Sequence, residues 1–185
     1  MIEAAILWRR LDIEGHDSCQ LVRLEDGWRL TGMAVFGHEG QACVASYGAE
    51  CDAAWRTRSA VVTGWLGAQA LDFHISTDAG RWTLNGVEQP QVAGCIDVDL
   101  GFTPATNLLG LRRFALAIGQ QTPAAAAYLA FPELRMQWLE QTYCRLDATK
   151  YRYTASAYRY DDVLEVSEHG FVLDYPGLWK AVATS

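Results

Sequence analysis

Apolar and polar residues alternate through most of this chain. In the segment 71–77, LDFHIST, the apolar side chains of Leu71, Phe73 and Ile75 alternate with polar or charged ones. The segment 149–162, TKYRYTASAYRYDD, shows the same alternation with tyrosines. A period of two places successive side chains on opposite faces of an extended strand. The pattern therefore predicts half-buried β-strands over most of the chain.

Short turn signals separate the alternating segments. EDG at 25–27, HEG at 38–40 and DAG at 78–80 each lie between two such segments. Glycine and aspartate are favoured in tight turns because they tolerate the required backbone angles. In the segment 164–175, LEVSEHGFVLDY, the residues EHG predict the turn of a hairpin.

A faint internal repeat supports this organisation. DGWRLTG at 26–32 resembles GRWTLNG at 80–86, and each follows an alternating segment. Both fit a hairpin with its Trp on the return strand, which favours an up-and-down meander. We expect one all-β domain over residues 1–185, with two pseudo-repeated halves as an option. A sheet of so many antiparallel strands must curl or close to protect its edges.

Helices are expected only as one or two short turns. Residues 123–143 contain an alanine run that favours a helix by propensity. However, Pro123 and Pro132 leave it only a short segment, so we predict a pair of strands there. Thr103 as a cap and Pro104 at the first helical position predict one short helical turn after them.

The net charge of the chain limits its partners. Asp and Glu outnumber Lys and Arg by 22 to 15, which gives a formal charge of -7 over 185 residues. A nucleic-acid partner requires a basic stripe and an anionic membrane requires basic clusters, and the sequence has neither. No run of about 18 apolar residues occurs, so we expect no stable membrane insertion. The first residues, MIEAAILWRRLDIEG, lack a secretory-signal pattern, which predicts a cytoplasmic protein.

The cysteines and histidines give no sign of a metal site or a cofactor. The five cysteines are an odd number, no two of them form a CxxC motif, and the four histidines are scattered. Structural zinc sites usually need such close pairs. The chain also lacks GxSxG, HExxH and a glycine-rich phosphate loop. We therefore expect reduced thiols, no metal, no cofactor and no assignable nucleophile.

The segment 94–113, GCIDVDLGFTPATNLLGLRR, carries an unusual number of polar residues within an apolar run. In a strand, Asp97 and Asp99 point to one side while Ile96 and Val98 point to the other. The two carboxylates could be an acid/base pair, a charged lining balanced by an arginine, or groups that bind the polar head of an amphiphile. Spacing alone leaves these three interpretations open, with structural pairing the most frequent arrangement.

Arg112 and Arg113 are the nearest candidate partners of the aspartates. In a strand these adjacent residues would face opposite ways, so at most one would line the lumen beside the carboxylates. Thr106 and Asn107 have a simple interpretation as turn-forming or capping residues. The alternative is that they donate hydrogen bonds at the rim of a pocket.

Tyrosines form a second group of candidates. Tyr153 and Tyr160 each belong to a pair of tyrosines at period two. Facing inward, they would line a pocket with apolar rings and polar tips, which suits a sugar or a lipid head group; facing outward, they would stabilise the sheet through cross-strand pairs. In the segment 172–179, VLDYPGLW, Tyr175 lies in a turn that would dock Trp179 onto the body of the protein.

Two groups of segments, taken together, resemble a known family. WTLNG, GCIDVDLGFTPATN and RRF form the first group, and YRYTASAYRYDD and HGFVLDYPGLW form the second. They are similar to signatures of a bacterial family named "putative glycolipid-binding", formerly a domain of unknown function. The resemblance spans about Trp28 to Trp179. It implies an antiparallel, incompletely closed β-barrel similar to the periplasmic lipoprotein carriers, and the binding of a glycolipid or another hydrophobic ligand.

We therefore predict a non-catalytic protein that binds an amphiphilic small molecule or a glycolipid in the lumen of the barrel. The alkyl part would lie against an apolar face and the head would meet the polar residues. One alternative is an enzyme that uses the Asp97/Asp99 pair on a sugar or ester, and another is a structural or interaction protein with a solid core. The oligomeric state is left open. The expected ligand-binding residues are Asp97, Asp99, Thr106, Asn107, Arg112, Tyr153, Tyr160, Tyr175 and Trp179.

Overall fold

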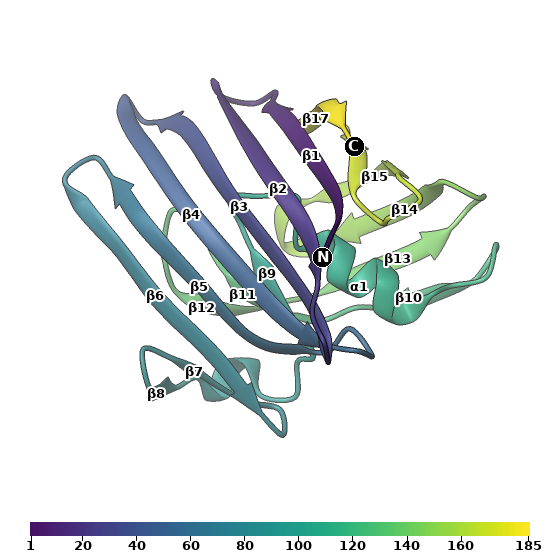
Figure 1. Cartoon of the computed structure of the whole chain (residues 1–185), viewed down its shortest axis with the longest axis horizontal. Coiled ribbons are helices and arrows are strands. Elements are labelled where there is room, and N and C mark those ends of the chain that lie inside the picture. The colour runs from purple at the N-terminus through teal and green to yellow at the C-terminus, as the bar shows by residue number, and fades with distance from the viewer.

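The computed structural model describes residues 1–185 and places most of them in β-strands (Figure 1). The first half of the chain forms β1 (Ile2–Arg10), β2 (Gly15–Arg23), β3 (Gly27–His38), β4 (Gln41–Asp52), β5 (Thr57–Leu66), β6 (Gln69–Asp78), β7 (Arg81–Leu84) and β8 (Val87–Glu88). The second half forms β9 (Asp97–Leu100), β10 (Gln121–Pro123), β11 (Ala126–Leu129), β12 (Met136–Leu139), β13 (Gln141–Arg145), β14 (Lys150–Ala155), β15 (Tyr160–Val166), β16 (Val172–Tyr175) and β17 (Trp179–Thr184). The helical elements are α1 (Asn107–Phe114) and the 3-10 turns η1 (Pro90–Val92) and η2 (Ser156–Tyr158).

Fourteen of these strands form one sheet in the order β10-β13-β14-β15-β16-β17-β1-β2-β3-β4-β5-β6-β7-β8. Strand β1 pairs with the last strand, β17, so the two ends of the chain meet near the middle of the sheet. Strands β10 and β8 are its two edges, and they do not pair with each other (Figure 1). The structure confirms the prediction of an all-β, many-stranded antiparallel fold that is not closed by hydrogen bonds and contains little helix.

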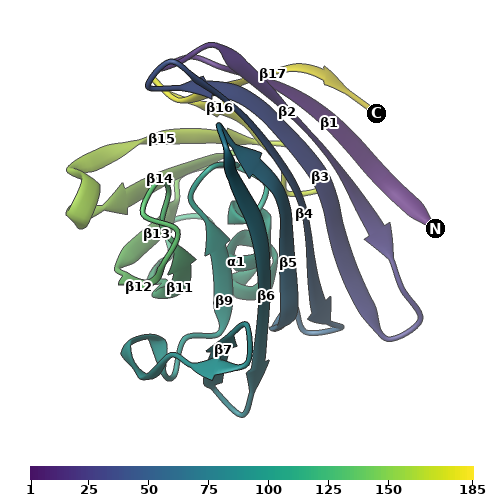
Figure 2. The ribbon, with the colours of Figure 1, turned by 90° about the vertical axis from the view of Figure 1, so that its left-hand side faces the viewer.

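The large sheet curves around a smaller inner layer (Figure 2). Within this layer β9 pairs in parallel with β11, which pairs with β12, and α1 follows β9 in the chain. Two hydrogen bonds attach β9 to the wall at Thr57, the first residue of β5. The Thr57 amide donates to the carbonyl of Ile96 at 3.2 Å, and the amide of Val98 donates to Thr57 Oγ1 at 3.0 Å.

The alternation in sequence appears as alternation in burial. In β2 the side chains of Asp17, Cys19 and Leu21 are buried between exposed neighbours. In β14 the buried residues include Tyr151 and Tyr153, again separated by an exposed residue. The expected strands with a period of two are therefore confirmed, and the tyrosines of β14 face inward.

Other local predictions are also confirmed. Residues 123–143 form strands rather than a helix, and residues 164–175 contain the hairpin between β15 and β16. The two segments of the faint repeat place Trp28 on β3 and Trp82 on β7, each on the return strand of an antiparallel pair.

The region after β9 differs from the expectation. Arg112 and Arg113 lie on α1, so they project about 100° apart around a helix rather than on opposite faces of a strand. The helix begins at Asn107, after a turn in which Thr103 Oγ1 accepts a hydrogen bond from the amide of Ala105 at 3.0 Å. The helix buries residues 107–111 in the interior, which a continuing strand would not have done.

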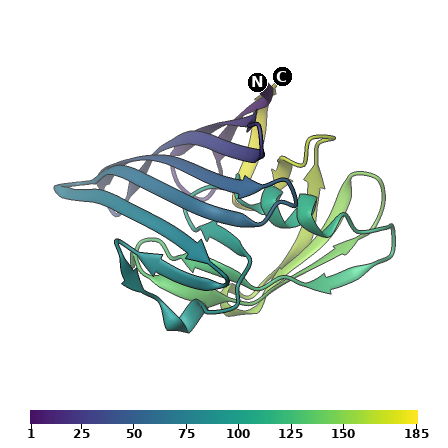
Figure 3. The same cartoon turned by 60° about the horizontal axis from the view of Figure 1, so that its bottom comes forward.

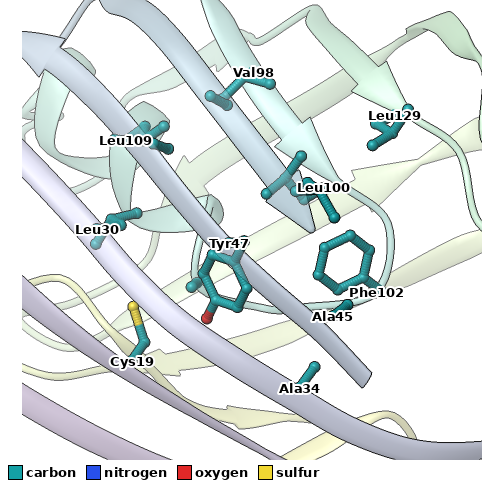
Figure 4. Packing of buried hydrophobic residues seen from close by; sticks show 14 of the residues in the cluster. Cys19, Leu30, Ala34, Ala45, Tyr47, Val98, Leu100, Phe102, Leu109 and Leu129 are labelled. Atoms are coloured by element: carbon teal, nitrogen blue, oxygen red, sulfur yellow. The ribbon is translucent and has the colours of Figure 1, made fainter. Parts of the chain in front are cut away.

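The interior is more completely filled than we expected. A cluster of 33 buried residues lies between the wall and the inner layer, and Figure 4 shows part of it. Tyr47 of the wall packs on Phe102 with ring centroids 5.8 Å apart, and Val98, Leu100 and Leu109 of the inner layer are buried in the same cluster. The apolar face that was expected to line an open lumen therefore packs largely against β9 and α1. A second cluster, of 13 buried residues, contains four tyrosines.

Candidate functional site

A partly open cavity of about 330 Å³ lies between the inner layer and the strands of the second half of the chain. Its lining comes from the ends of β1 and β9, from α1, from β11 and β12, and from the strands β14–β17. Six of the nine residues expected from the sequence lie in this lining: Asp99, Asn107, Tyr153, Tyr160, Tyr175 and Trp179. The fold thus gathers these six residues, which are separated by up to 80 positions, around a single space.

Tyrosine rings form one wall of the cavity. Tyr153 lies at the centre, with ring centroids 5.0 Å from Tyr143, 5.9 Å from Tyr160 and 5.7 Å from Tyr175. Tyr160 donates a hydrogen bond to the carbonyl of Pro176 at 3.0 Å. Burial raises the pKa of Tyr153, Tyr160 and Tyr175, so their hydroxyl groups stay protonated at neutral pH. The wall presents apolar ring surface together with polar hydroxyl tips.

Asp99 places a carboxylate in this largely aromatic lining. Its Oδ1 accepts a hydrogen bond from Thr106 Oγ1 at 3.0 Å, and its Oδ2 accepts one from Gln141 Nε2 at 2.6 Å. Burial raises the pKa of Asp99, and the two hydrogen bonds oppose that shift. Neither partner is a cation, so the carboxylate is stabilised by dipoles alone. Each oxygen retains capacity to accept a further hydrogen bond from a hydroxyl group.

Asp97 points to the same side of β9 but has a different environment. Both of its carboxylate oxygens accept hydrogen bonds from Arg113, Oδ1 from Nε at 2.9 Å and Oδ2 from Nη2 at 2.6 Å. The space that borders both Asp97 and Asp99 measures only about 10 Å³, which is room for roughly one water molecule. Asp97 therefore belongs to a structural ion pair behind the cavity rather than to its lining.

Asn107 and Thr106 have separate positions at the start of α1. Asn107 lines the cavity, and its Nδ2 donates to the hydroxyl of Tyr143 at 2.7 Å. Thr106 lies behind the lining, where its hydroxyl also accepts the amide of Leu100 at 3.2 Å. Together with its bond to Asp99, this contact makes Thr106 a bridge between the helix and β9.

Arg112 lies away from the cavity. It is exposed, its guanidinium carbon lies 5.1 Å from the ring centroid of Trp55, and it donates to the carbonyl of Glu168 at 3.4 Å. It lines a separate surface groove of about 400 Å³. The structure thus gives the role of aspartate partner to Arg113.

Sequence reasoning did not identify several residues of the lining. Arg10 is the most distinctive, since it is the one basic residue in the lining. A signal for it existed: Arg10 shares its inward parity in β1 with Ala4, Ile6 and Trp8, all of which are buried. The others that were not identified are Leu100, Gly101, Thr103, Tyr128, Phe131, Leu139, Ala155, Tyr158 and Leu178.

Two further observations concern metal binding and the spanning of a membrane. The structure contains no group of three or more His, Cys, Asp or Glu side chains arranged to hold a metal ion. None of its helices has both the length and the apolar character needed to span a bilayer.

Comparisons with known proteins agree with the resemblance noted in the sequence. The profile of a family described as "Putative glycolipid-binding" matches residues 5–181. The fold is similar to the crystal structure of a DUF1089 family protein from Pseudomonas aeruginosa, with a TM-score of 0.79 and 32% sequence identity over 89% of this chain and 90% of that one. No curated protein matches the chain. Because the profile match covers nearly its whole length, the chain belongs to the family described as "Putative glycolipid-binding".

Proposed function

We propose that the cavity binds the polar end of an amphiphile, such as a glycolipid, without catalysing a reaction. The observation that carries this proposal is the combination found in one space: a tyrosine wall beside the Asp99 carboxylate and the Asn107 amide. Aromatic rings provide apolar contact for the faces of a sugar or the start of an alkyl chain. The carboxylate and the amide provide partners for hydroxyl groups. The family to which the chain belongs carries the same expectation in its description.

The size of the cavity limits what it can enclose. At about 330 Å³ it lies near the lower end of the roughly 300–1,000 Å³ range of ligand pockets. It therefore fits one sugar-sized head with a short part of a chain rather than an entire two-chain lipid. Tyr158 is 53% exposed while it also lines the cavity, so it marks the side that opens to solvent. The remainder of the alkyl chain would leave the protein there, and each CH2 that stays buried would contribute about 0.8 kcal/mol.

The geometry of the two aspartates does not favour the enzyme alternative. An acid/base pair acting on a sugar or ester needs both carboxylates beside a space large enough for the substrate. Here Asp97 is fully engaged by Arg113, and the space that borders both carboxylates is about 10 Å³. The solid-core alternative predicts that no cavity exists, whereas a cavity of about 330 Å³ is present.

The proposal is tested with octyl β-D-glucopyranoside, measured by native mass spectrometry and calorimetry below the micelle concentration of the detergent. We expect one molecule to bind per chain, and 1-octanol and free glucose to bind much more weakly. Ala155→Trp should abolish binding because Ala155 is buried in the cavity lining. Val182→Trp, at a half-exposed position of β17, is the matched control and should bind like the wild type.

Circular dichroism of both variants establishes that they are folded before binding is compared. Undiminished binding to Ala155→Trp would place the ligand outside the cavity and contradict the proposal. A second readout is the organic extract of protein purified from its own host. A co-purifying amphiphile near one-to-one stoichiometry supports the proposal. Protein that is purified without an amphiphile and also fails to bind the glucoside contradicts it.

We also propose that binding takes place in the cytoplasm, where the protein would hold or present a lipid intermediate. Its five cysteines are free thiols, four of them buried, which is the state that a reducing compartment maintains. Cell fractionation with an antibody against the native protein tests this, and recovery from the periplasm would contradict it.

A further inference from the structure

Arg10 is held rigidly at the end of β1, in the wall of the cavity. Its Nε and Nη2 donate to the two carboxylate oxygens of Asp12 at 2.8 and 3.1 Å. Its guanidinium carbon lies 4.8 Å from the ring centroid of Phe36 and 5.1 Å from that of Trp179. Only 12% of the Arg10 side chain is exposed. Two hydrogen bonds and two aromatic rings therefore fix the plane of the guanidinium and the direction of its remaining nitrogen.

That remaining nitrogen, Nη1, has no partner. Among all buried side-chain nitrogen and oxygen atoms of the chain, it is the single one that makes no hydrogen bond. A guanidinium cannot lose its charge to avoid this cost, and an unpaired donor on a charged group is more costly than a neutral one. Arg10 lines the cavity, so the cavity is the space from which an acceptor can come. Nη1 itself has no exposed surface, so an acceptor in the cavity reaches it only when a side chain of the lining moves aside.

The charges around the cavity favour a neutral acceptor. Asp12 already balances the charge of Arg10, and the other acidic group in the lining, Asp99, has no cationic partner. No second basic residue lines the cavity. An anionic group on the ligand would therefore be buried beside Asp99 without a counter-charge, which is strongly unfavourable.

The surroundings of Arg10 favour a carbonyl over a hydroxyl group. Phe36 and Trp179 lie against the guanidinium, and Phe131 packs on Phe36 with ring centroids 5.2 Å apart. None of these three side chains can accept a hydrogen bond from a hydroxyl group. We propose that Arg10 selects ligands that carry an acyl carbonyl next to a hydroxylated head, with Nη1 donating to the carbonyl oxygen. This inference rests on the proposed binding function of the cavity and adds a chemical requirement to it.

The test uses two probes that differ only in a carbonyl group: methyl 6-O-octanoyl-α-D-glucopyranoside and methyl 6-O-octyl-α-D-glucopyranoside. Calorimetry should show that the wild-type protein binds the ester about 10-fold more tightly than the ether, the effect of one hydrogen bond from a charged donor. Arg10→Met should bind both probes equally. Arg9→Met is the matched control, because Arg9 is an exposed residue of the same strand, and it should keep the preference for the ester.

The outcomes separate this inference from the function on which it rests. Equal binding of the two probes by the wild type, or a preference that persists in Arg10→Met, overturns the role of Arg10 and leaves glucoside binding in place. If neither probe binds while octyl β-D-glucopyranoside does, the role of Arg10 is overturned; if none of the three glucosides binds, both proposals are overturned. If Arg10→Met does not fold, Arg10→Lys takes its place. The lysine keeps a positive charge beside Asp12 but lacks the planar fork, and it should also lose the preference.

Discussion

Arg113, rather than its neighbour Arg112, neutralises the buried aspartate at the start of β9. The side chains of Arg113 and Asp97 are only 16% and 8% exposed, and they form two hydrogen bonds. Arg112 is exposed and contacts no carboxylate within ion-pair distance. Breaking a buried pair from one side leaves an uncompensated charge, which costs much more than losing an exposed cation.

Replacement of each arginine by Met therefore gives unequal results. Arg113→Met should lower the free energy of unfolding by about 3 kcal/mol, because Asp97 stays buried without a partner. Arg112→Met should change it by less than about 1 kcal/mol. Urea unfolding of the two variants at pH 7 measures both changes. Equal losses would contradict the assignment of the pair to Arg113.

A second buried carboxylate, Asp17 of β2, lies behind the cavity. Its side chain accepts hydrogen bonds from the hydroxyl of Tyr47, at 3.0 Å to Oδ2, and from the hydroxyl of Thr103, which lines the cavity. Asp17 is 1% exposed and no cation pairs with it. Burial raises the pKa of Asp17 to about 6, although the two hydrogen bonds act in the opposite direction.

The raised pKa of Asp17 predicts that stability falls as the pH rises from about 4 to about 6. In this range the folded state keeps a proton on Asp17 that the unfolded state, with a pKa near 3.9, has already lost. The contribution is on the order of 2 to 3 kcal/mol at pH 4 and is lost above pH 6. Burial also raises the pKa of Asp99, so the contribution of Asp17 is isolated by comparing the wild type with Asp17→Asn. Urea unfolding at several pH values should give the variant a flatter profile, and identical profiles would refute the assignment.

At the scale of elements, two glycines differ in whether their surroundings leave room for a β-carbon. In β3, Gly32 faces Tyr47 across the sheet, and a β-carbon there would overlap the tyrosine ring and lie 2.6 Å from the carbonyl oxygen of Ser18. In α1, a β-carbon on Gly110 would meet its nearest atoms, of Asp97 and Tyr143, at 3.6 Å, an ordinary contact distance. The strand therefore requires its glycine for close packing, whereas the helix does not.

The same substitution should thus have opposite effects in the two elements. Gly32→Ala should lower the free energy of unfolding by about 1 to 3 kcal/mol through overpacking. Gly110→Ala should raise it by about 0.5 to 1 kcal/mol, because alanine favours the helical backbone. Thermal and urea unfolding measure both values. A destabilised Gly110→Ala would show that the contact of α1 with β9 is tighter than these distances indicate.

At the scale of the whole molecule, the pairing of β1 with β17 makes the ends of the chain part of the sheet. Both termini emerge from this pair of strands, on the same side of the molecule in the view of Figure 3. Ser185 and Ala5 exchange two backbone hydrogen bonds of 2.9 Å. Since β17 also supplies Trp179 to the cavity, the pairing of the first and last strands holds one wall of the proposed binding site in place.

A circular permutant tests whether the fold depends on where the chain begins and ends. We join Ser185 to Met1 with about six Gly and Ser residues, enough to span the four residues by which Met1 extends past Ala5. New ends at Gly40, in the tight turn between β3 and β4, should leave the fold and glucoside binding intact. New ends between Ala45 and Ser46, within β4, should prevent folding. Circular dichroism and unfolding curves distinguish the two, and failure of the first permutant would contradict the prediction.

What the sequence determined by itself is the local pattern. Alternation at period two is a property of neighbouring residues, so it correctly predicted the strands and the common direction of Asp97 and Asp99, while the structure decided that the tyrosines of β14 face inward. The turn signals correctly predicted hairpins for the same reason, because turn geometry depends on a few consecutive residues. These local features were sufficient for the fold class.

The tertiary structure determined the features that depend on contacts between residues far apart in the sequence. Only the packing of the chain shows that the segment with Arg112 and Arg113 forms a helix that fills the interior, and that Arg113 is the residue that reaches Asp97. The position of Arg10 beside Trp179 likewise arises from the pairing of the first strand with the last. Such contacts depend on which elements meet in space, and the free energy that selects them comes from burial and charge pairing across the whole fold rather than from any local stretch of sequence.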